Sequence, residues 1–282
     1  MKIVVASGKG GTGKTLVATS LFLHWARQGK DPTYVDADVE EPNGHLFLAP
    51  EIDGAERFSV PVPVLEGKCD GCGRCGKACA FSAIVPLKDR VMIFPAFCHS
   101  CGACITACPK GSLRVSRREI GSVRWGKAAG ARFLDGTLDV GEARAARLVE
   151  GVVDFAKRDR ILVDAPPGTA CPAVAAVKGA DLALLVTEPT PFGRHDLDLA
   201  LKLCRALGVP PLVIMNRCDL AGGLDSADPP VDAPVIARLP FDPQIATATA
   251  MGMPAIDAAP ALALAVAEIA AVLERAVPGE LP

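Results

Sequence analysis

Long apolar runs are scarce in this chain of 282 residues, although half of its residues are hydrophobic. The most apolar stretch near the C-terminus, residues 261–273, is too short to cross a bilayer and is interrupted by Glu268. It predicts a buried helix, and no basic amphipathic tail accompanies it, so we expect no stable membrane insertion. The N-terminus also lacks a signal-peptide pattern, because Met1 and Lys2 lead directly into a strand pattern. We therefore expect a cytoplasmic protein.

An excess of charge of one sign is also lacking. The chain has 30 Lys and Arg against 32 Asp and Glu, a formal net charge of -2, which gives no reason to expect nucleic acid as a general partner. Residues 110–132 are a local exception, with basic side chains at seven positions and only Glu119 as an acid. A hairpin with a solvated basic face and a docking face for an acidic partner both fit this segment.

Cysteine, in contrast, is abundant, with 11 in the chain. Eight of them form two runs of equal spacing, Cys69-x2-Cys72-x2-Cys75-x3-Cys79 and Cys98-x2-Cys101-x2-Cys104-x3-Cys108. In such runs three cysteines bind one 4Fe-4S cluster, and the fourth binds the cluster of the other run. The spacing thus predicts two 4Fe-4S clusters, one on Cys69, Cys72, Cys75 and Cys108, the other on Cys98, Cys101, Cys104 and Cys79.

Zinc sites and disulfides are alternative uses of these cysteines. A tetrahedral zinc site does not require a third cysteine at the same step, and disulfides need an oxidising compartment for which the sequence has no export signal. From about Lys68 to Val115 the chain resembles a bacterial two-cluster ferredoxin. The proline that usually follows the fourth cysteine is replaced in the first run by Ala80, which removes no ligand.

A second strong pattern opens the chain. An apolar strand pattern at residues 2–7 leads into Gly8-Lys9-Gly10-Gly11-Thr12-Gly13-Lys14-Thr15 and then into an apolar helical run through Trp25. This is G-x-x-x-x-G-K-[ST] in its strand-loop-helix setting. Backbone N–H groups of the loop would surround phosphate oxygens, Lys14 would reach the β- and γ-phosphates, and Thr15 would bind Mg²⁺. The sequence predicts an Mg²⁺-dependent ATPase that binds ATP and ADP.

The extra lysine, Lys9, resembles the early lysine of the MinD/Mrp/ParA and nitrogenase iron protein superfamily, whose Walker A motif is deviant. In that superfamily the lysine crosses a dimer interface to the partner's nucleotide, so the resemblance implies an ATP-dependent homodimer. Asp36-Ala37-Asp38, after a strand pattern, resembles switch I. The resemblance implies that Asp38 orients the attacking water, that Asp36 and Asp38 lie in the Mg²⁺ region, and that Lys9, Lys14 and Asp38 are the catalytic residues.

Two later segments carry the same resemblance. Residues 160–169 resemble the Walker B strand and switch II in the Asp-x-Pro-Pro-Gly-Thr form of the Mrp branch. This implies that Asp164 holds Mg²⁺ through water, that Pro167 limits the loop to few conformations, and that Gly168 senses the γ-phosphate. Asn216 follows an apolar strand pattern at the place where the family recognises the base, although asparagines after strands are also common in turns.

The order of these elements predicts a doubly wound, mostly parallel α/β sheet with an inserted ferredoxin-like α+β domain. We expect the P-loop ATPase domain over residues 1–62 and 116–282 and the insert over 63–115. Of the remaining cysteines, Cys204 is expected in the core. Cys171 is expected to be a buried thiol beside switch II rather than a ligand of a bridging cluster, because no second cysteine lies between Cys108 and Cys171.

Two hypotheses of different classes follow. In the first, a nucleotide-driven dimer switch gates electron transfer, or iron-sulfur or metallocofactor assembly, on a client protein. In the second, the chain is a MinD/ParA-like positioning or regulatory ATPase whose insert senses redox state or docks a partner. The missing membrane segment and basic charge count against the second. The absence of the C-terminal C-x-x-C found in Mrp-type scaffolds counts against simple cluster donation in the first.

Overall fold

The computed structural model describes residues 1–156, 160–220 and 232–276. These residues form two compact units. The first contains Met1–Glu56, Val123–Thr137 and the chain from Ala145 on, and the second contains Arg57–Ser122 and Leu138–Arg144. The second unit includes all of the predicted insert, together with flanking residues and the segment 138–144. The functional assignment of the two domains stays a prediction.

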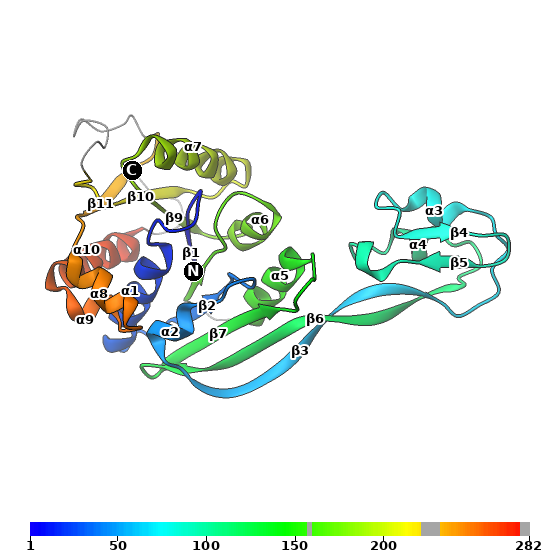
Figure 1. The fold of residues 1–282 in the computed structure, drawn as a ribbon, viewed down its shortest axis with the longest axis horizontal. Coiled ribbons are helices and arrows are strands. Elements are labelled where there is room, and N and C mark those ends of the chain that lie inside the picture. The colour runs from blue at the N-terminus through cyan, green and yellow to red at the C-terminus, as the bar shows by residue number, and fades with distance from the viewer. Residues whose placement is uncertain (157–159, 221–231, 277–282) are drawn as a thin grey trace. The chain divides into compact units, whose positions relative to one another are not determined.

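A nine-stranded sheet organises the first unit, in the order β11-β10-β9-β1-β8-β2-β7-β6-β3 (Figure 1). Its parallel part consists of β1 (Lys2–Ala6), β2 (Thr33–Asp36), β7 (Ala131–Leu138), β8 (Ile161–Asp164), β9 (Leu182–Thr187), β10 (Pro211–Asn216) and β11 (Val235–Leu239). The two remaining strands, β3 (Glu51–Leu65) and β6 (Leu113–Ala128), each have residues in both units.

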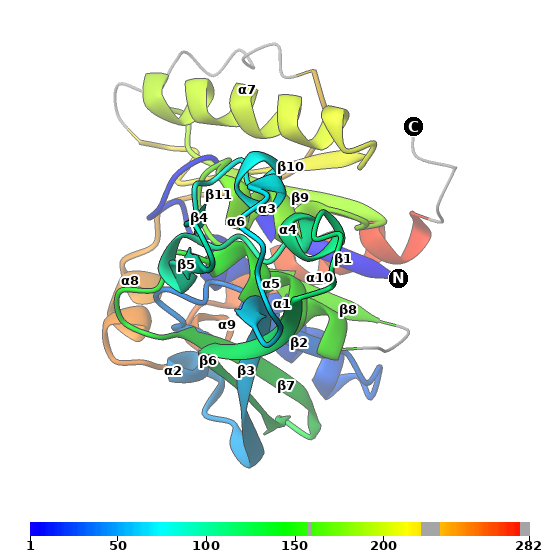
Figure 2. The ribbon, with the colours of Figure 1, turned by 90° about the vertical axis from the view of Figure 1, so that its right-hand side faces the viewer.

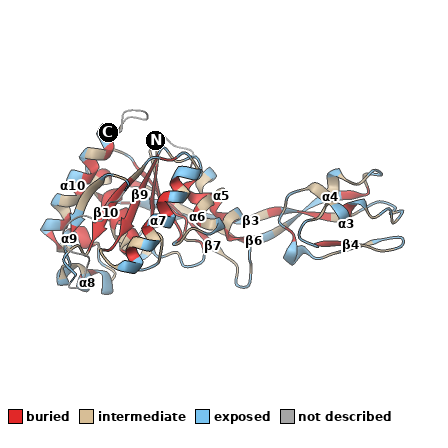
Figure 3. Ribbon diagram, turned by 90° about the horizontal axis from the view of Figure 1, so that it is seen from above, coloured by how far each residue is buried: buried red, intermediate tan, exposed pale blue. Residues whose placement is uncertain are grey.

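Continuous apolar sequence explains the central strands. Every residue of β9 is buried, and β1 is buried at all positions after Lys2. Strands of a parallel sheet are covered on both faces, and they therefore require apolar side chains at successive positions. Figure 3 shows this burial along the sheet, with exposed residues on the outer faces of the helices.

Helices cover both faces of the sheet (Figure 1). One layer contains α1 (Lys14–Arg27), α8 (Pro243–Ala250), α9 (Ala255–Ala258) and α10 (Pro260–Arg275), and the other contains α5 (Ala145–Phe155), α6 (Cys171–Val177) and α7 (Pro191–Ala206). Figure 2 shows α7 lying along β9 and β10. The short α2 (Gly44–Leu48) follows switch I. This arrangement confirms an α/β fold with a mostly parallel sheet.

Most of the basic segment 110–132 lies in β6 and in the two-residue turn Ala129-Gly130 that leads into β7. So short a turn can join only antiparallel neighbours, and it gives the sheet its mixed character. Three of the basic side chains are paired with acids: Lys110 with Asp70, Arg118 with Glu142, and Arg124 with the buried Asp135.

The second unit holds little regular structure. Besides its parts of β3 and β6 it contains α3 (Arg74–Ala78), the antiparallel pair β4 (Ile84–Pro86) and β5 (Val91–Ile93), a 3-10 turn at Pro95–Phe97, and α4 (Ala103–Thr106). Its buried side chains form two small clusters, Cys75, Ile84, Cys104 and Leu113 in one and Val62, Ala83 and Cys98 in the other. Cysteines therefore belong to both clusters.

The C-terminal stretch 261–273 lies within α10 as a core helix, with Leu262, Val266, Ile269, Ala270 and Leu273 buried. Among the residues that the structure describes, no helix is both long and apolar enough to cross a membrane.

An aromatic contact accompanies the pairing of β2 with β7. Tyr34 lies opposite Phe133 in the register, and their rings stack at 5.8 Å. Because Phe133 is fully buried, Phe133→Ala should lower the free energy of unfolding by about 3–5 kcal/mol. Chemical denaturation monitored by circular dichroism measures this loss. Phe192→Ala is the matched control, since Phe192 is 80% exposed, and it should change stability by about 0.5 kcal/mol or less. Equal effects of the two changes would contradict this register.

Candidate nucleotide and cluster sites

The phosphate loop connects the end of β1 to the start of α1. Gly13 caps α1 in the left-handed region, with φ 94°, and a Cβ there would lie 2.3 Å from the side-chain nitrogen of Asn216. A Cβ on Gly8 would lie 2.2 Å from the backbone oxygen of Asp196. Both positions therefore require glycine, which explains two of the glycines in the motif.

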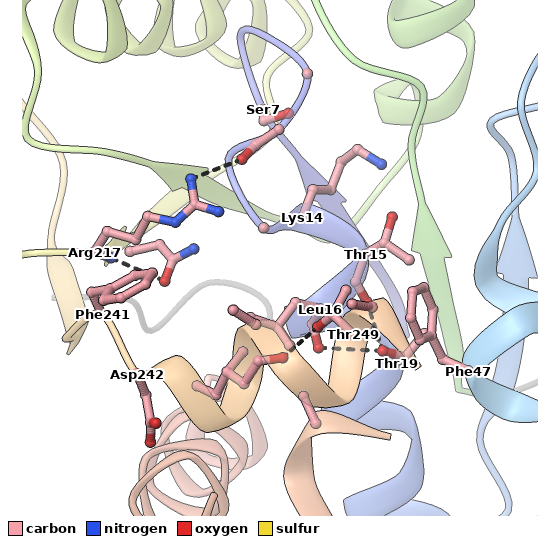
Figure 4. Close-up of a pocket in the computed structure, with 18 of the residues that line it drawn as sticks. Ser7, Lys14, Thr15, Leu16, Thr19, Phe47, Arg217, Phe241, Asp242 and Thr249 are labelled. Atoms are coloured by element: carbon pink, nitrogen blue, oxygen red, sulfur yellow. Dashed lines mark hydrogen bonds between the residues drawn. The ribbon is translucent and has the colours of Figure 1, made fainter. Parts of the chain in front are cut away.

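A cavity of about 570 Å³ opens beside this loop (Figure 4). Its lining includes these predicted site residues: Gly10, Gly11, Gly13, Lys14, Thr15, Asp38, Pro167 and Asn216. Gly8, Lys9, Thr12, Asp36, Asp164 and Gly168 are absent from the lining. Phe47, Phe241 and Ile245 add apolar surface, so the cavity combines the phosphate loop and the cations Lys14 and Arg217 with apolar side chains. An anionic group attached to a flat heterocycle suits that combination.

Lys14 is buried and lies against switch II. Its Nζ is 2.8 Å from Asp164 Oδ1, and the Tyr34 hydroxyl donates to Asp164 Oδ2 at 3.0 Å. Burial lowers the pKa of Lys14, but the charge and hydrogen bond of Asp164 together with the charges of Asp38 and Asp36 outweigh burial and leave that pKa raised. The β2–β8 register sets Asp36 opposite Asp164. The carboxyl ends of neighbouring parallel strands thus bring Lys14, Asp36 and Asp164 together, as expected for a site in this type of sheet.

The carboxylates at this edge of the sheet are only partly balanced by the positive charge of Lys14. Burial and the Asp164 charge raise the pKa of Asp36 to about 8, although the Gly44 N–H donates to it at 2.8 Å. Burial raises the pKa of Asp38 to about 6, with the Lys14 charge opposing the shift. A cation placed among these carboxylates would relieve the excess.

This donor set fits Mg²⁺. The ion usually takes only one or two carboxylates and completes its shell with waters and phosphate oxygens. Thr15 lines the cavity next to Lys14 and supplies a hydroxyl.

Lys9, the early lysine of the loop, is held by Glu188. Its Nζ lies 3.2 Å from Glu188 Oε2, while Arg217 contacts Glu188 Oε1 at 2.5 Å and also donates to the Gly11 carbonyl at 3.3 Å. Glu188 is buried and directly follows β9. Sequence reasoning missed its role, although its place at the carboxyl end of a parallel strand was a usable signal.

Asn216 is tied to the phosphate loop. Its side-chain nitrogen donates to the Thr12 carbonyl at 2.7 Å, and its side-chain oxygen accepts from the Arg217 N–H at 3.0 Å. One N–H of the amide is left for a ligand. The contact of Asn216 with a base stays a prediction.

Switch II is joined to the phosphate loop through Gly168, whose N–H donates to the Ser7 carbonyl at 2.9 Å. Cys171 begins α6 three positions later and is exposed, so its predicted burial is wrong. The inward stripe of this short helix is formed by residues such as Ala173, Ala176 and Val177, which leaves the first position outside. Cys204 is buried as expected, and burial raises the pKa of its thiol to about 11.

In the second unit, two cavities are each lined by cysteines of both runs. The larger, of about 220 Å³, is lined by Cys79, Cys98, Cys101 and Cys104, with apolar side chains such as Phe81, Ile84 and Val115. The other is lined by Cys69, Cys72, Cys75 and Cys108. Each set combines the first three cysteines of one run with the last of the other. These are the two sets predicted from the spacing.

Backbone N–H groups point at several of these sulfurs. Gly71 donates to Cys69 Sγ at 3.4 Å, Ala83 to Cys79 Sγ at 3.3 Å, and Ser100 to Cys98 Sγ at 3.4 Å. The Ser100 hydroxyl is buried and has no hydrogen-bond partner among the described residues. Cavities lined by cysteines, with backbone N–H groups near the sulfurs, offer the donor atoms that iron-sulfur clusters use. In the described part of the chain, no three of these side chains converge closely enough to hold a metal ion, and cluster binding stays a prediction.

Comparisons with known proteins place the chain among proteins of related sequence and fold. A protein of Methanocaldococcus jannaschii described as uncharacterized is 30% identical over 228 residues, which cover 77% of this chain and 80% of that protein. An iron-sulfur cluster carrier protein of Pyrococcus abyssi is 24% identical, covering 90% of this chain and 79% of that one. The structure of the septum site-determining protein MinD with Mg-ADP from Pyrococcus horikoshii superposes with a TM-score of 0.60 at 23% identity, over 99% of each chain. This similarity shows the same fold.

The family model for the CobQ/CobB/MinD/ParA nucleotide binding domain matches residues 3–255, which include the phosphate loop, both switches and Asn216. The chain therefore belongs to the CobQ/CobB/MinD/ParA family of P-loop nucleotide-binding domains.

Proposed function

We propose that this protein is an ATPase in which the nucleotide state controls two 4Fe-4S clusters carried on the same chain, for electron transfer or metallocofactor assembly on a client protein. One observation carries the proposal. The chain has two cavities, each lined by four cysteines drawn from both runs, in addition to a phosphate loop whose lysine is paired with the switch II aspartate. The name of the Pyrococcus abyssi relative, an iron-sulfur cluster carrier protein, supports it.

The size of the second unit supports bound clusters independently. It has roughly 70 residues, and units of that size usually need disulfides or metal in addition to an apolar core. All eight cysteines of its runs are free thiols in the structure. Cys69, Cys72, Cys75 and Cys108 would hold one cluster, and Cys98, Cys101, Cys104 and Cys79 the other. When bound, the clusters would supply one-electron redox chemistry at low potential.

The residues of the first unit have separate roles in ATP hydrolysis. Lys14 would exchange part of its contact with Asp164 for the β- and γ-phosphates, and the loop N–H groups would hold the phosphate oxygens. Asp38 would orient the attacking water, and Asn216 with Phe241 would bind the base. Thr15, Asp36 and Asp164 would hold Mg²⁺ directly or through water, and the ion when bound would neutralise phosphate charge.

An ATP-dependent homodimer is part of the proposal. Lys9 is partly exposed, with a side chain 34% accessible, while its partner Glu188 is held by Arg217 as well. Lys9 can therefore move away from Glu188 without leaving that buried carboxylate unpaired, because Arg217 still compensates its charge. This freedom is what a lysine that reaches a partner's nucleotide needs.

The proposal predicts that reduction of the clusters weakens ATP binding. An added electron and a bound nucleotide both add negative charge to the protein, and two additions of like charge oppose each other. Reduced protein should bind a non-hydrolysable ATP analogue at least about fivefold more weakly than oxidised protein. Anaerobic titration of protein holding about eight iron atoms per chain measures both affinities.

Lys14→Ala is the control for this comparison. It should abolish ATP turnover in both redox states and leave the visible iron-sulfur absorbance unchanged. Equal affinities in the two redox states would reject redox control and favour a MinD/ParA-like positioning or regulatory ATPase instead. Persistent turnover in Lys14→Ala would reject the phosphate-loop assignment.

Replacing Lys9 should separate nucleotide binding from dimerisation. Lys9→Ala should keep monomer affinity for the ATP analogue within about threefold, because Lys14 and the loop N–H groups remain, yet lose the dimer. Sedimentation velocity with and without the analogue measures the oligomeric state. Lys202→Ala, an exposed position on α7, should dimerise as the unmodified chain does. A Lys9→Ala dimer of unchanged stability would disprove this role of Lys9.

A further inference from the structure

The two cysteine runs differ at the residue that precedes their second cysteine. In the first run this residue is Gly71, with φ 69°, and in the second it is Ser100, with φ 58°. A Cβ on Gly71 would lie 2.2 Å from the Lys88 carbonyl oxygen, so the first run requires glycine there. A left-handed backbone disfavours any residue that has a Cβ. The second run therefore holds a serine in a conformation in which glycine would be less strained.

The hydroxyl group of Ser100 is unpaired in the described part of the chain. Its oxygen is buried, and no described residue makes a hydrogen bond with it. Removing a hydroxyl from water without giving it a partner is unfavourable, and buried polar side-chain atoms in proteins generally have one. A strained serine with an unpaired hydroxyl thus indicates a partner that the described residues do not supply.

The larger cysteine cavity is the place where such a partner would lie, because Ser100 belongs to its lining. Apart from the cysteines, the lining residues that the structure describes have only two polar side chains, His99 and Ser100, and the His99 ring stacks on Phe81 at 3.6 Å. A buried water needs two to four polar partners, which this lining does not offer in side chains. The sulfur atoms of a cluster are good acceptors for a hydroxyl.

The loop that carries Ser100 is held by contacts within the second unit. The Ser100 N–H donates to Cys98 Sγ at 3.4 Å, and the Cys98 carbonyl accepts from Arg144 Nη1 at 3.3 Å. Arg144 is buried and forks onto Glu142, with Nε 2.6 Å from Oε1 and Nη2 2.5 Å from Oε2. This bidentate geometry fixes the plane of the guanidinium. The backbone around Ser100 is therefore fixed independently of its hydroxyl.

We infer that the Ser100 hydroxyl donates a hydrogen bond to a sulfur atom of the 4Fe-4S cluster in the larger cysteine cavity, and that it makes this cluster easier to reduce. Reduction adds one electron to the cluster, and a hydrogen-bond donor beside its sulfurs stabilises the added negative charge. The other cluster has no corresponding donor, because Gly71 has no side chain. The inference rests on the proposed function, since it requires bound clusters.

Ser100→Gly separates this role from a structural one. Glycine removes the hydroxyl and relieves the left-handed backbone, so the variant should fold as stably as the unmodified chain. Reduction of one cluster should nevertheless become at least about fivefold less favourable, which is about 40 mV for one electron. The matched control is Ser82→Gly. Ser82 also has a left-handed backbone, with φ 52°, but it is exposed and lines neither cysteine cavity.

The experiment uses the full chain, loaded with both clusters under anaerobic conditions and titrated with dithionite under EPR detection. The unmodified chain and Ser82→Gly should give the same two reduction steps. In Ser100→Gly one step should move to lower potential by the stated amount, and the other should stay in place. Ser100→Ala, which lacks the hydroxyl but keeps the backbone strain, should move the same step in the same direction.

The outcomes distinguish this inference from the proposed function. Unchanged potentials in Ser100→Gly and Ser100→Ala, with full iron content, overturn the role of the hydroxyl and leave the proposed function standing. An equal shift in Ser82→Gly assigns the effect to the backbone and also overturns that role. An unmodified chain that binds no iron overturns the cluster part of the proposed function, and this inference with it. Should Ser100→Gly lose iron, the potentials of Ser100→Ala decide in the same way.

Discussion

The ion pair between Lys14 and Asp164 is the interaction on which the nucleotide site depends. It joins the phosphate loop to the strand that leads into switch II, and both side chains are almost completely buried. Removing one partner of such a pair typically costs about 3–5 kcal/mol, because the other charge is left uncompensated in the interior. The pair therefore fixes the geometry of the loop. Lys14 can nevertheless exchange Asp164 for phosphate oxygens, which are equally good partners for an ammonium group.

The neighbouring carboxylates make that exchange favourable. The pKa values of the buried Asp36 and the half-buried Asp38 are raised by their burial and by the Asp164 charge, although Lys14 opposes the shift. A divalent cation that arrives with ATP would supply the missing positive charge. The same arrangement thus accounts for a stable loop and for a site that responds to nucleotide, which is the property a switch requires.

The parts of the structure that sequence predicted well are those set by local spacing. The phosphate loop between β1 and α1 and the strand ends at Asp36 and Asp164 follow from short motifs. Spacing also grouped the eight cysteines into the two sets that line two cavities, and cluster binding by these sets stays a prediction.

Long-range pairings were not accessible in the same way. Glu188 meets Lys9, and Arg144 meets the Cys98 carbonyl, only because the fold brings remote segments together. The exposure of Cys171 depends on which side of the short helix α6 faces the sheet. A helix of only one to two turns has too few residues for the spacing of its apolar side chains to reveal the buried side. The two polar pairings lie at the phosphate loop and at the cysteine loops, where they would influence function.

The central claim, that nucleotide and clusters influence each other within one chain, is tested most directly by the midpoint potentials of the clusters. Potentiometric titration with EPR detection, with and without a saturating non-hydrolysable ATP analogue, measures them. The account predicts that nucleotide lowers the potential of at least one cluster by about 40 mV or more, which is the one-electron equivalent of a fivefold difference in nucleotide affinity. Potentials that are identical with and without nucleotide would contradict it.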